Sequence, residues 1–240
     1  MRKLVFFLLI SFVSVSVFAQ KQIDDANAQI RKVSGFHTIK VSHGIVLYLT
    51  QGNEEVVAVS SNDIEYRDRI RTVVDNGVLK IYFDNDDWKF WKNVGNKKLR
   101  AYVSAKTIEG IYSSSGSSVR IEGTIKSGEI KLDASSGASI NGKIEAQSMD
   151  VDQSSGSTIS ISGVINGKLK IEGSSGSTFN SYDLTVENCD AETSSGAGVK
   201  VTVNKELSVE ASSGGYIHFK GNGLIRDVHT SSGGNVTRKS

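Results

Sequence analysis

The residues with the clearest capacity for chemistry are carboxylates that recur at one position of a repeat. Each stands two residues before a Ser-Ser-Gly triplet, in five consecutive repeats: Asp133, Asp152, Glu172, Glu192 and Glu210. If the repeats stack, these side chains form an outward-facing column. Stacked oxygen ligands could bind a divalent cation such as calcium, and a strip of negative charge could bind a basic partner.

The same column also has a structural interpretation, as a charged face that keeps the protein in solution. Lys131 and Lys170 stand two residues before Asp133 and Glu172, where they can offset part of the repulsion diagonally. This interpretation is the favoured one, so the sequence predicts no metal site and no cofactor. The five carboxylates remain candidates for ligand binding.

A second candidate site is the segment from Asp84 to Lys92, which holds both tryptophans of the protein, Trp88 and Trp91. Aromatic side chains in a polar loop can bind a glycan face or an apolar partner. Alternatively, both rings fold back over the end of the repeat region as a lid. The sequence leaves these two interpretations open.

The sequence offers little support for catalysis. Its four histidines have no zinc-ligand spacing, and it contains neither a Gly-x-Ser-x-Gly elbow nor a phosphate-binding loop. The single cysteine, Cys189, falls in an apolar column and is predicted to be a buried thiol. We therefore expect a protein that is not an enzyme.

The repeat itself supplies the elements that must position these residues. Ser-Ser-Gly occurs seven times, with its glycine at 116, 137, 156, 176, 196, 214 and 233. A period of about 20 residues suits one coil of a β-solenoid. Apolar residues stand three before each first serine and three after each glycine, as inward-facing strand positions do. The sequence predicts an all-β fold whose coils are strand, Ser-Ser-Gly corner, strand.

The Ser-Ser-Gly ladder is also a candidate surface, because rows of hydroxyls could bind sugars or order water. Serine and glycine are, however, ordinary turn residues that satisfy local backbone groups. The spacing between copies varies from 18 to 21 residues, which argues against a precise lattice match. We expect the triplet to act mainly as a corner.

Residues 20–112 differ from the repeat region at 113–240, and we expect them to be β-rich and to cap the solenoid, since an open end needs cover. Asp75-Asn76-Gly77 predicts a hairpin. Asn62 or Asp63 is a candidate cap for a short helix that carries Ile64, Ile70 and Val73.

Residues 1–19 are predicted to be a secretory signal peptide, because Arg2 and Lys3 precede an apolar run and Ala19 ends a cleavage site. The full chain has 28 basic and 26 acidic residues, so removing Arg2 and Lys3 leaves 26 of each. This balance of charge predicts that the protein has no nucleic-acid partner. The sequence has no second long apolar run, so we expect no membrane-spanning segment after cleavage. We expect export to the periplasm, the outer-membrane surface or the medium.

The order of these features resembles the putative auto-transporter adhesin head GIN domain family of Bacteroidota-type bacteria. The resemblance covers residues from about 30 to 240 and is carried by Phe36-x-x-Ile39-x-Val41, the Gln51-Gly52 turn, Val73-x-Asp75-x-Gly77-x-Leu79-x-Ile81, Ile108 to Ile111 and the serial Ser-Ser-Gly coils. It implies a right-handed parallel β-helix in an exported cell-envelope protein for which adhesion is the suggested role.

Three classes of function follow from these features. The first is adhesin-like binding of a glycan, a matrix component or a surface protein. The second is a carbohydrate-active enzyme, because several such enzymes are β-helices, although coils of 18 to 21 residues leave little room for catalytic loops. The third is a structural solenoid that packs against others. The oligomeric state is left open.

Overall fold

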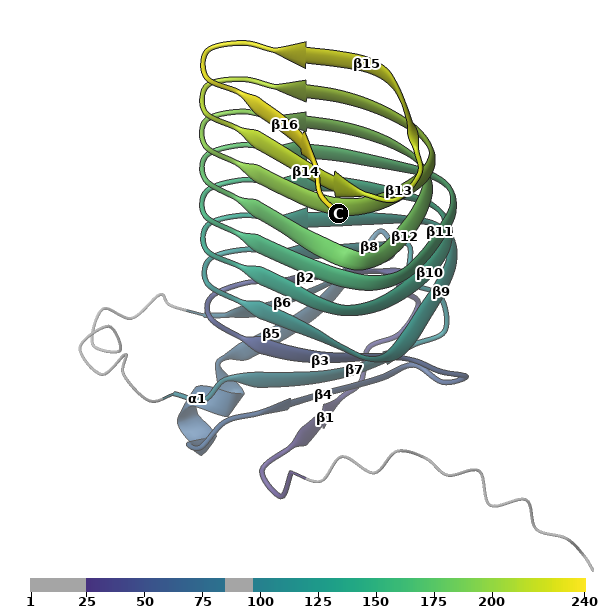
Figure 1. The fold of residues 1–240 in the computed structure, drawn as a ribbon. Coiled ribbons are helices and arrows are strands. Elements are labelled where there is room, and N and C mark those ends of the chain that lie inside the picture. Colours follow the sequence, from purple (N-terminus) through teal and green to yellow (C-terminus); the bar gives the residue numbers. More distant parts are fainter. Residues whose placement is uncertain (1–24, 85–96) are drawn as a thin grey trace, which may run out of the picture.

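The structure is a stack of β-coils, and it confirms the predicted all-β solenoid (Figure 1). It is a computed structural model that describes residues 25–84 and 97–240. The predicted signal peptide at 1–19 and the tryptophans Trp88 and Trp91 lie outside the described residues. Within the described part of the chain, no helix is long and apolar enough to cross a membrane.

The described residues form one short helix and a series of strands that lengthen in the repeat region. In chain order these are β1 (Gln29–Arg31), β2 (Thr38–Val41), β3 (Val46–Gln51), β4 (Val56–Ser60), α1 (Ile64–Asp68), β5 (Ile70–Asp75), β6 (Val78–Phe83), β7 (Arg100–Ala105), β8 (Gly110–Ser113), β9 (Ser118–Ala134), β10 (Ser139–Gln153), β11 (Thr158–Gly173), β12 (Thr178–Thr193), β13 (Gly198–Ala211), β14 (Tyr216–Lys220), β15 (Leu224–Thr230) and β16 (Asn235–Arg238). Each strand from β9 to β13 runs from one Ser-Ser-Gly corner to the next.

Successive coils pair in parallel, so equivalent positions of the repeat lie directly above one another. Ile140 of β10 lies opposite Val119 of β9 on one side and Ile159 of β11 on the other. All three side chains are buried. The alternation of inward apolar and outward polar residues thus builds one continuous core along the inside of the stack.

The parallel stack extends into the N-terminal region. β8 pairs with β2 and β9 with β3, and below these β6 pairs with β2 and β7 with β3. Ser42-His43-Gly44 therefore forms a corner beneath Ser114-Ser115-Gly116, and the Gly44 N–H donates to the Ser115 carbonyl at 3.0 Å. Because the middle residue of this corner is histidine, it does not match the Ser-Ser-Gly pattern of the repeat.

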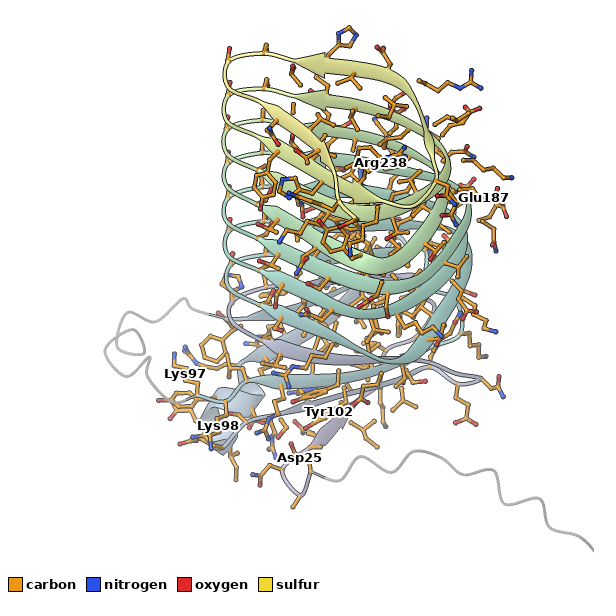
Figure 2. All side chains as sticks on the ribbon, viewed as in Figure 1. Asp25, Lys97, Lys98, Tyr102, Glu187 and Arg238 are labelled. Atoms are coloured by element: carbon orange, nitrogen blue, oxygen red, sulfur yellow. The ribbon has the colours of Figure 1, made fainter. Side chains whose placement is uncertain are left out.

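Antiparallel strands cover the N-terminal end of the stack. β4 pairs with β7, β1 with β4, and β5 with β6. The Tyr102 hydroxyl donates to Oδ2 of Asp25 at 2.9 Å, a contact at the end of the molecule that Figure 2 labels. Burial, together with this carboxylate, raises the pKa of Tyr102 to about 12. The contact fastens the segment before β1 to the end of the solenoid.

The hairpin prediction is confirmed, while the helix prediction is only half right. β5 and β6 pair antiparallel around Asn76 and Gly77, which both have positive φ. Asp63 caps α1 as predicted, but the helix ends at Asp68. Ile70 and Val73 belong to β5, because the β-branched run there favours a strand and the hairpin gives it a partner.

At the opposite end, the last coil is open. β15 pairs with β13 and β16 pairs with β14, and within the described residues no further coil stacks on them. Val228 occupies a column that the repeat pattern places inside, yet its side chain is 42% exposed, and Ile225 is 47% exposed. These residues face inward over the core, but no coil covers them.

Candidate functional site

The predicted carboxylate column is present as stacked neighbours in the structure. Asp133 lies opposite Asp152, Asp152 opposite Glu172, Glu172 opposite Glu192, and Glu192 opposite Glu210. Adjacent strands in a sheet lie about 4.8 Å apart, so the carboxylates follow one another at roughly that interval. These outward side chains of β9 to β13 form what we call the acidic column.

The acidic column ends in a different kind of residue on each side. His229 lies opposite Glu210 at the C-terminal end. At the N-terminal end, Tyr112 lies opposite Asp133, and Lys40 and then Lys80 continue the same position. Tyr112 and His229 also stand two residues before a Ser-Ser-Gly triplet, so the repeat pattern includes them, but it misses both lysines because their strands lie outside the repeat. The side-chain charge along this row therefore changes from positive at Lys80 and Lys40 to negative from Asp133 onward.

Two lysines neutralise part of the acidic column. Lys131 Nζ lies 2.5 Å from Oδ2 of Asp152, diagonally across two coils as predicted, and Lys170 Nζ lies 2.5 Å from Oε1 of Glu172 in its own strand. In the part of the chain that the structure describes, Asp133, Glu192 and Glu210 have no ion pair. The column therefore keeps unneutralised negative charge at both of its ends.

Asp133 is the carboxylate whose environment most disfavours ionisation. Partial burial, and then the neighbouring charge of Asp152, raise the pKa of Asp133, while Lys131 and Lys40 act in the opposite direction. The hydrogen bond with Asp152, in turn, is the largest cause of the raised pKa of Lys131. The N-terminal part of the column is thus a coupled set of charges.

A shallow groove of about 300 Å³ runs along the acidic column over four coils. Its walls are the carboxylates, the first serine of the corners and the residues between them: Asp133, Ala134, Asp152, Gln153, Ser154, Glu172, Gly173, Ser174, Glu192 and Ser194. The groove could accept an extended chain that presents cationic groups to the carboxylates and hydrogen-bonding groups to the serines.

The metal-binding alternative gains no geometric support. Among the described residues, no three His, Cys, Asp or Glu side chains are arranged so that they could hold a metal ion. The carboxylates follow one line along the stack, whereas calcium requires six to eight oxygen ligands around one point. The arrangement suits an extended cationic ligand better than a single ion.

The Ser-Ser-Gly triplets form the corners themselves. The second serine has φ between 46° and 53° and the glycine between 69° and 79° in all seven copies. Two successive residues with positive φ define a type I′ turn, which the first serine closes through its carbonyl. The glycine N–H then donates to the second serine of the next coil at 3.0 to 3.1 Å. The triplet is thus a stacked turn with its backbone groups paired between coils.

The residue after each glycine is a structural feature that the sequence pattern missed. It is always small: Ser117, Ala138, Ser157, Ser177, Ala197, Gly215 and Gly234. The buried Ser157 and Ser177 hydroxyls donate to the carbonyls of Ala134 and Gln153 in the coil before, at 2.8 and 3.2 Å. The signal was a four-residue motif, Ser-Ser-Gly-small, rather than a triplet.

The buried cysteine and the histidines His37 and His218 lie on different coils, while Ser42 Oγ and His43 Nδ1 are 2.8 Å apart at the N-terminal corner. Cys189 is buried as predicted, and burial raises the pKa of its thiol to about 12. His37 pairs with Glu109 at 2.9 Å in the N-terminal region, whereas His218 lies on β14 near the other end. Burial and nearby lysines lower the pKa of His218. In the described part of the chain, no hydrogen bond or ion pair joins Cys189, His37 and His218 to one another.

Comparisons with known proteins agree with this architecture. The family model described as "Putative auto-transporter adhesin, head GIN domain" matches residues 35–223. No curated protein matches the chain by sequence.

Several solved structures share the fold. A putative adhesin from Bacteroides fragilis aligns with a TM-score of 0.79 and 14% identity over 88% of this chain and 96% of that one. A putative lipid binding protein from Parabacteroides distasonis aligns with a TM-score of 0.68 and 16% identity, over 90% of this chain and 98% of that one. A putative adhesin from the same species aligns with a TM-score of 0.67 and 18% identity, over 89% of this chain and 96% of that one. At these identities the likeness concerns the fold.

Proposed function

This chain belongs to the putative auto-transporter adhesin, head GIN domain family, and from that premise we propose that it is an exported, non-enzymatic envelope protein that binds a partner through its acidic column. The family supports an adhesin-like role at or beyond the cell surface. The acidic column supports a partner that carries spaced positive charges, such as a basic segment of a surface or matrix protein.

The observation that carries this proposal is the set of unneutralised carboxylates beside a groove. Among the described residues, Asp152 and Glu172 pair with lysines, whereas Asp133 and Glu192, which also line the groove, have no ion pair. Stacking like charges at one position in five coils adds repulsion that a solubilising face avoids when its charges are spread over several positions. A groove that joins those carboxylates to serine side chains is a surface on which a cationic chain could lie.

The decisive test compares charge-neutral variants of two different surfaces. The triple variant Glu172→Gln, Glu192→Gln, Glu210→Gln removes charge from the acidic column while keeping side-chain size. The matched control Glu129→Gln, Glu145→Gln, Glu187→Gln removes the same charge from other positions on the coils. Wild type and both variants are probed on arrays of glycans and matrix proteins. We expect a basic protein to bind wild type and control, and to lose at least about tenfold in affinity for the column variant.

Salt dependence provides a second readout of the same proposal. Binding through exposed carboxylates should weaken as ionic strength rises, because the Debye length falls to about 10 Å at 0.1 M salt. Equal binding by all three proteins, or binding that salt does not affect, would contradict a role for the acidic column.

Trp88 and Trp91 are a second proposed contact surface, for a glycan. A Trp88→Ala, Trp91→Ala variant on the same arrays separates the two surfaces. Loss of glycan binding in that variant alone would assign glycan recognition to the tryptophan segment. Turnover of a polysaccharide by wild type, lost in an Asp133→Ala, Asp152→Ala, Glu172→Ala variant, would instead favour the enzymatic alternative.

A further inference from the structure

The open C-terminal coil leaves part of the core without cover. Ile225 and Val228 of β15 stack on Leu207 and Val209 of β13, which are fully or almost fully buried. In every coil below, another coil covers the corresponding side chains. Leu224, 68% exposed, lies opposite Glu206 of β13 and faces outward, so it is not part of this inward face. Ile225 and Val228 form an apolar patch at the end of the solenoid.

The backbone of this coil is open as well. β15 and β16 each pair on one side only among the described residues, so their outer edges present unpaired N–H and C=O groups. Such an edge is a template for another strand, and solenoids normally require a polar cap at each end. The N-terminal end has antiparallel strands over it, whereas the C-terminal end has an edge and an apolar patch.

The order of residues in β15 makes this edge complementary to itself. Ile225, Arg226, Asp227 and Val228 read apolar, cation, anion, apolar. In an antiparallel pair of two β15 strands, the register that places Ile225 opposite Val228 of the second copy also places Arg226 opposite Asp227 of the second copy. Two-fold symmetry then produces each of these contacts twice.

The pairing of β15 with β13 within one chain fits that arrangement. The register between β13 and β15 shifts after Leu207, so Ile225 pairs with Leu207 and Val228 with Val209 while Arg226 is the extra residue. Ile225 and Val228 therefore both face inward, and their pairing would join the two cores. Arg226 and Asp227 lie between them at the outer surface. Arg226 also pairs with Glu206 of β13, and its several N–H donors can serve both carboxylates.

We propose that two copies of this chain associate end to end through their last coils, with β15 pairing antiparallel to β15 of the second copy. The two cores become one continuous core, and the N-terminal ends point away from each other. The resulting dimer presents two acidic columns, so a partner with repeated basic segments would bind with higher avidity than to one copy.

Charge exchange at β15 tests the proposal without removing any apolar contact. The protein, purified after export, is studied by sedimentation velocity and by size-exclusion chromatography with light scattering over a wide range of concentrations. We expect wild type to dimerise. Arg226→Asp places two carboxylates opposite each other across the symmetry axis and should raise the dimer dissociation constant by about tenfold or more. The double variant R226D/D227R restores opposite charges in the same register and should restore the dimer.

Two further variants complete the test. Ile225→Lys with Val228→Lys charges the apolar patch and should abolish the dimer, while circular dichroism confirms that the coils remain folded. Val164→Lys charges an exposed apolar residue elsewhere on the solenoid and should leave the dimer intact. A monomer at every concentration, failure of the double charge exchange to restore the dimer, or loss of the dimer in the Val164→Lys variant would each overturn the proposal.

Discussion

The carbonyl oxygen of Ile144 lies where a side chain on Gly163 would have to be. A Cβ built on Gly163 would come within 2.1 Å of that oxygen, and the φ of Gly163 is +119°. The two residues are direct neighbours in adjacent coils. Here the backbone of one coil passes so close to the next that only glycine fits.

Gly163→Ala should accordingly be among the most destabilising single methyl additions in the solenoid. The clashing atom belongs to the backbone and cannot swing away, and the positive φ adds strain, so we expect a loss of about 2–4 kcal/mol in the free energy of unfolding. Urea denaturation measures it. Gly128→Ala is the matched control, because nothing lies within 4 Å of its Cβ position. Similar losses in both variants would contradict the argument.

A second prediction concerns the buried small residue after each corner. Ser177→Ala should cost only about 1 kcal/mol, because it removes one hydrogen bond to Gln153 and alanine already occupies the same position at Ala138 and Ala197. Ser177→Val should cost about 1–3 kcal/mol because the space is filled. Thermal denaturation compares the two variants, and a valine variant as stable as the alanine variant would show that the position is not tightly packed.

The thiol of Cys189 should be inert in the folded protein. Burial raises its pKa to about 12, so almost no thiolate forms at pH 8 and no reagent can approach. A colorimetric thiol reagent should therefore react at a rate limited by opening of the coil, and at once when denaturant is added. Rapid stoichiometric labelling of the native protein at pH 8 would indicate that this coil opens readily.

The raised pKa of Asp133 predicts that the Asp133→Asn variant is more stable than wild type, by an amount that depends on pH. Its pKa in the folded state is raised, so the protonated form favours folding, and that contribution is lost as pH rises through the folded-state pKa. Asp133→Asn should therefore raise Tm at neutral pH, and the gain should vanish well below the ordinary value of 3.8. Asp183→Asn, at an exposed carboxylate elsewhere, serves as the comparison. A lower Tm for Asp133→Asn at pH 7 would mean that attraction by Lys40 and Lys131 outweighs burial.

The fold of the repeat region could be predicted because equivalent residues of successive coils have the same physical surroundings. Burial of Ile140 between Val119 and Ile159 follows from the alternation of apolar residues and from the constant distance to the corner. The stacking of Asp133 on Asp152 follows from the same distance. Period-two patterning and a regular turn are local signals, and they determine the solenoid without knowledge of distant contacts.

Features that depend on contacts between unlike segments could not be predicted in this way. Lys40 and Lys80 join the row of the acidic column through strands that lack the repeat. The exposure of Val228 depends on what lies above it, not on its own position in the repeat. The left-handed conformation of the second serine was also missed, because serine seldom adopts positive φ and the neighbouring glycine offered a sufficient explanation.

The corners keep their register while the coils differ in length, and the differences are absorbed along the strands between corners. Register shifts fall between Ala146 and Ser148, between Ile159 and Gly163, and between Ser181 and Thr185, never at a Ser-Ser-Gly corner. Duplication or deletion of a coil during evolution would keep the corner pairing, provided that close contacts such as that of Gly163 with Ile144 are matched in the new neighbour. Each such event would change the height of the stack by one step of about 4.8 Å. The number of coils thus sets the length of the solenoid, while the stacked corners keep its cross-section the same.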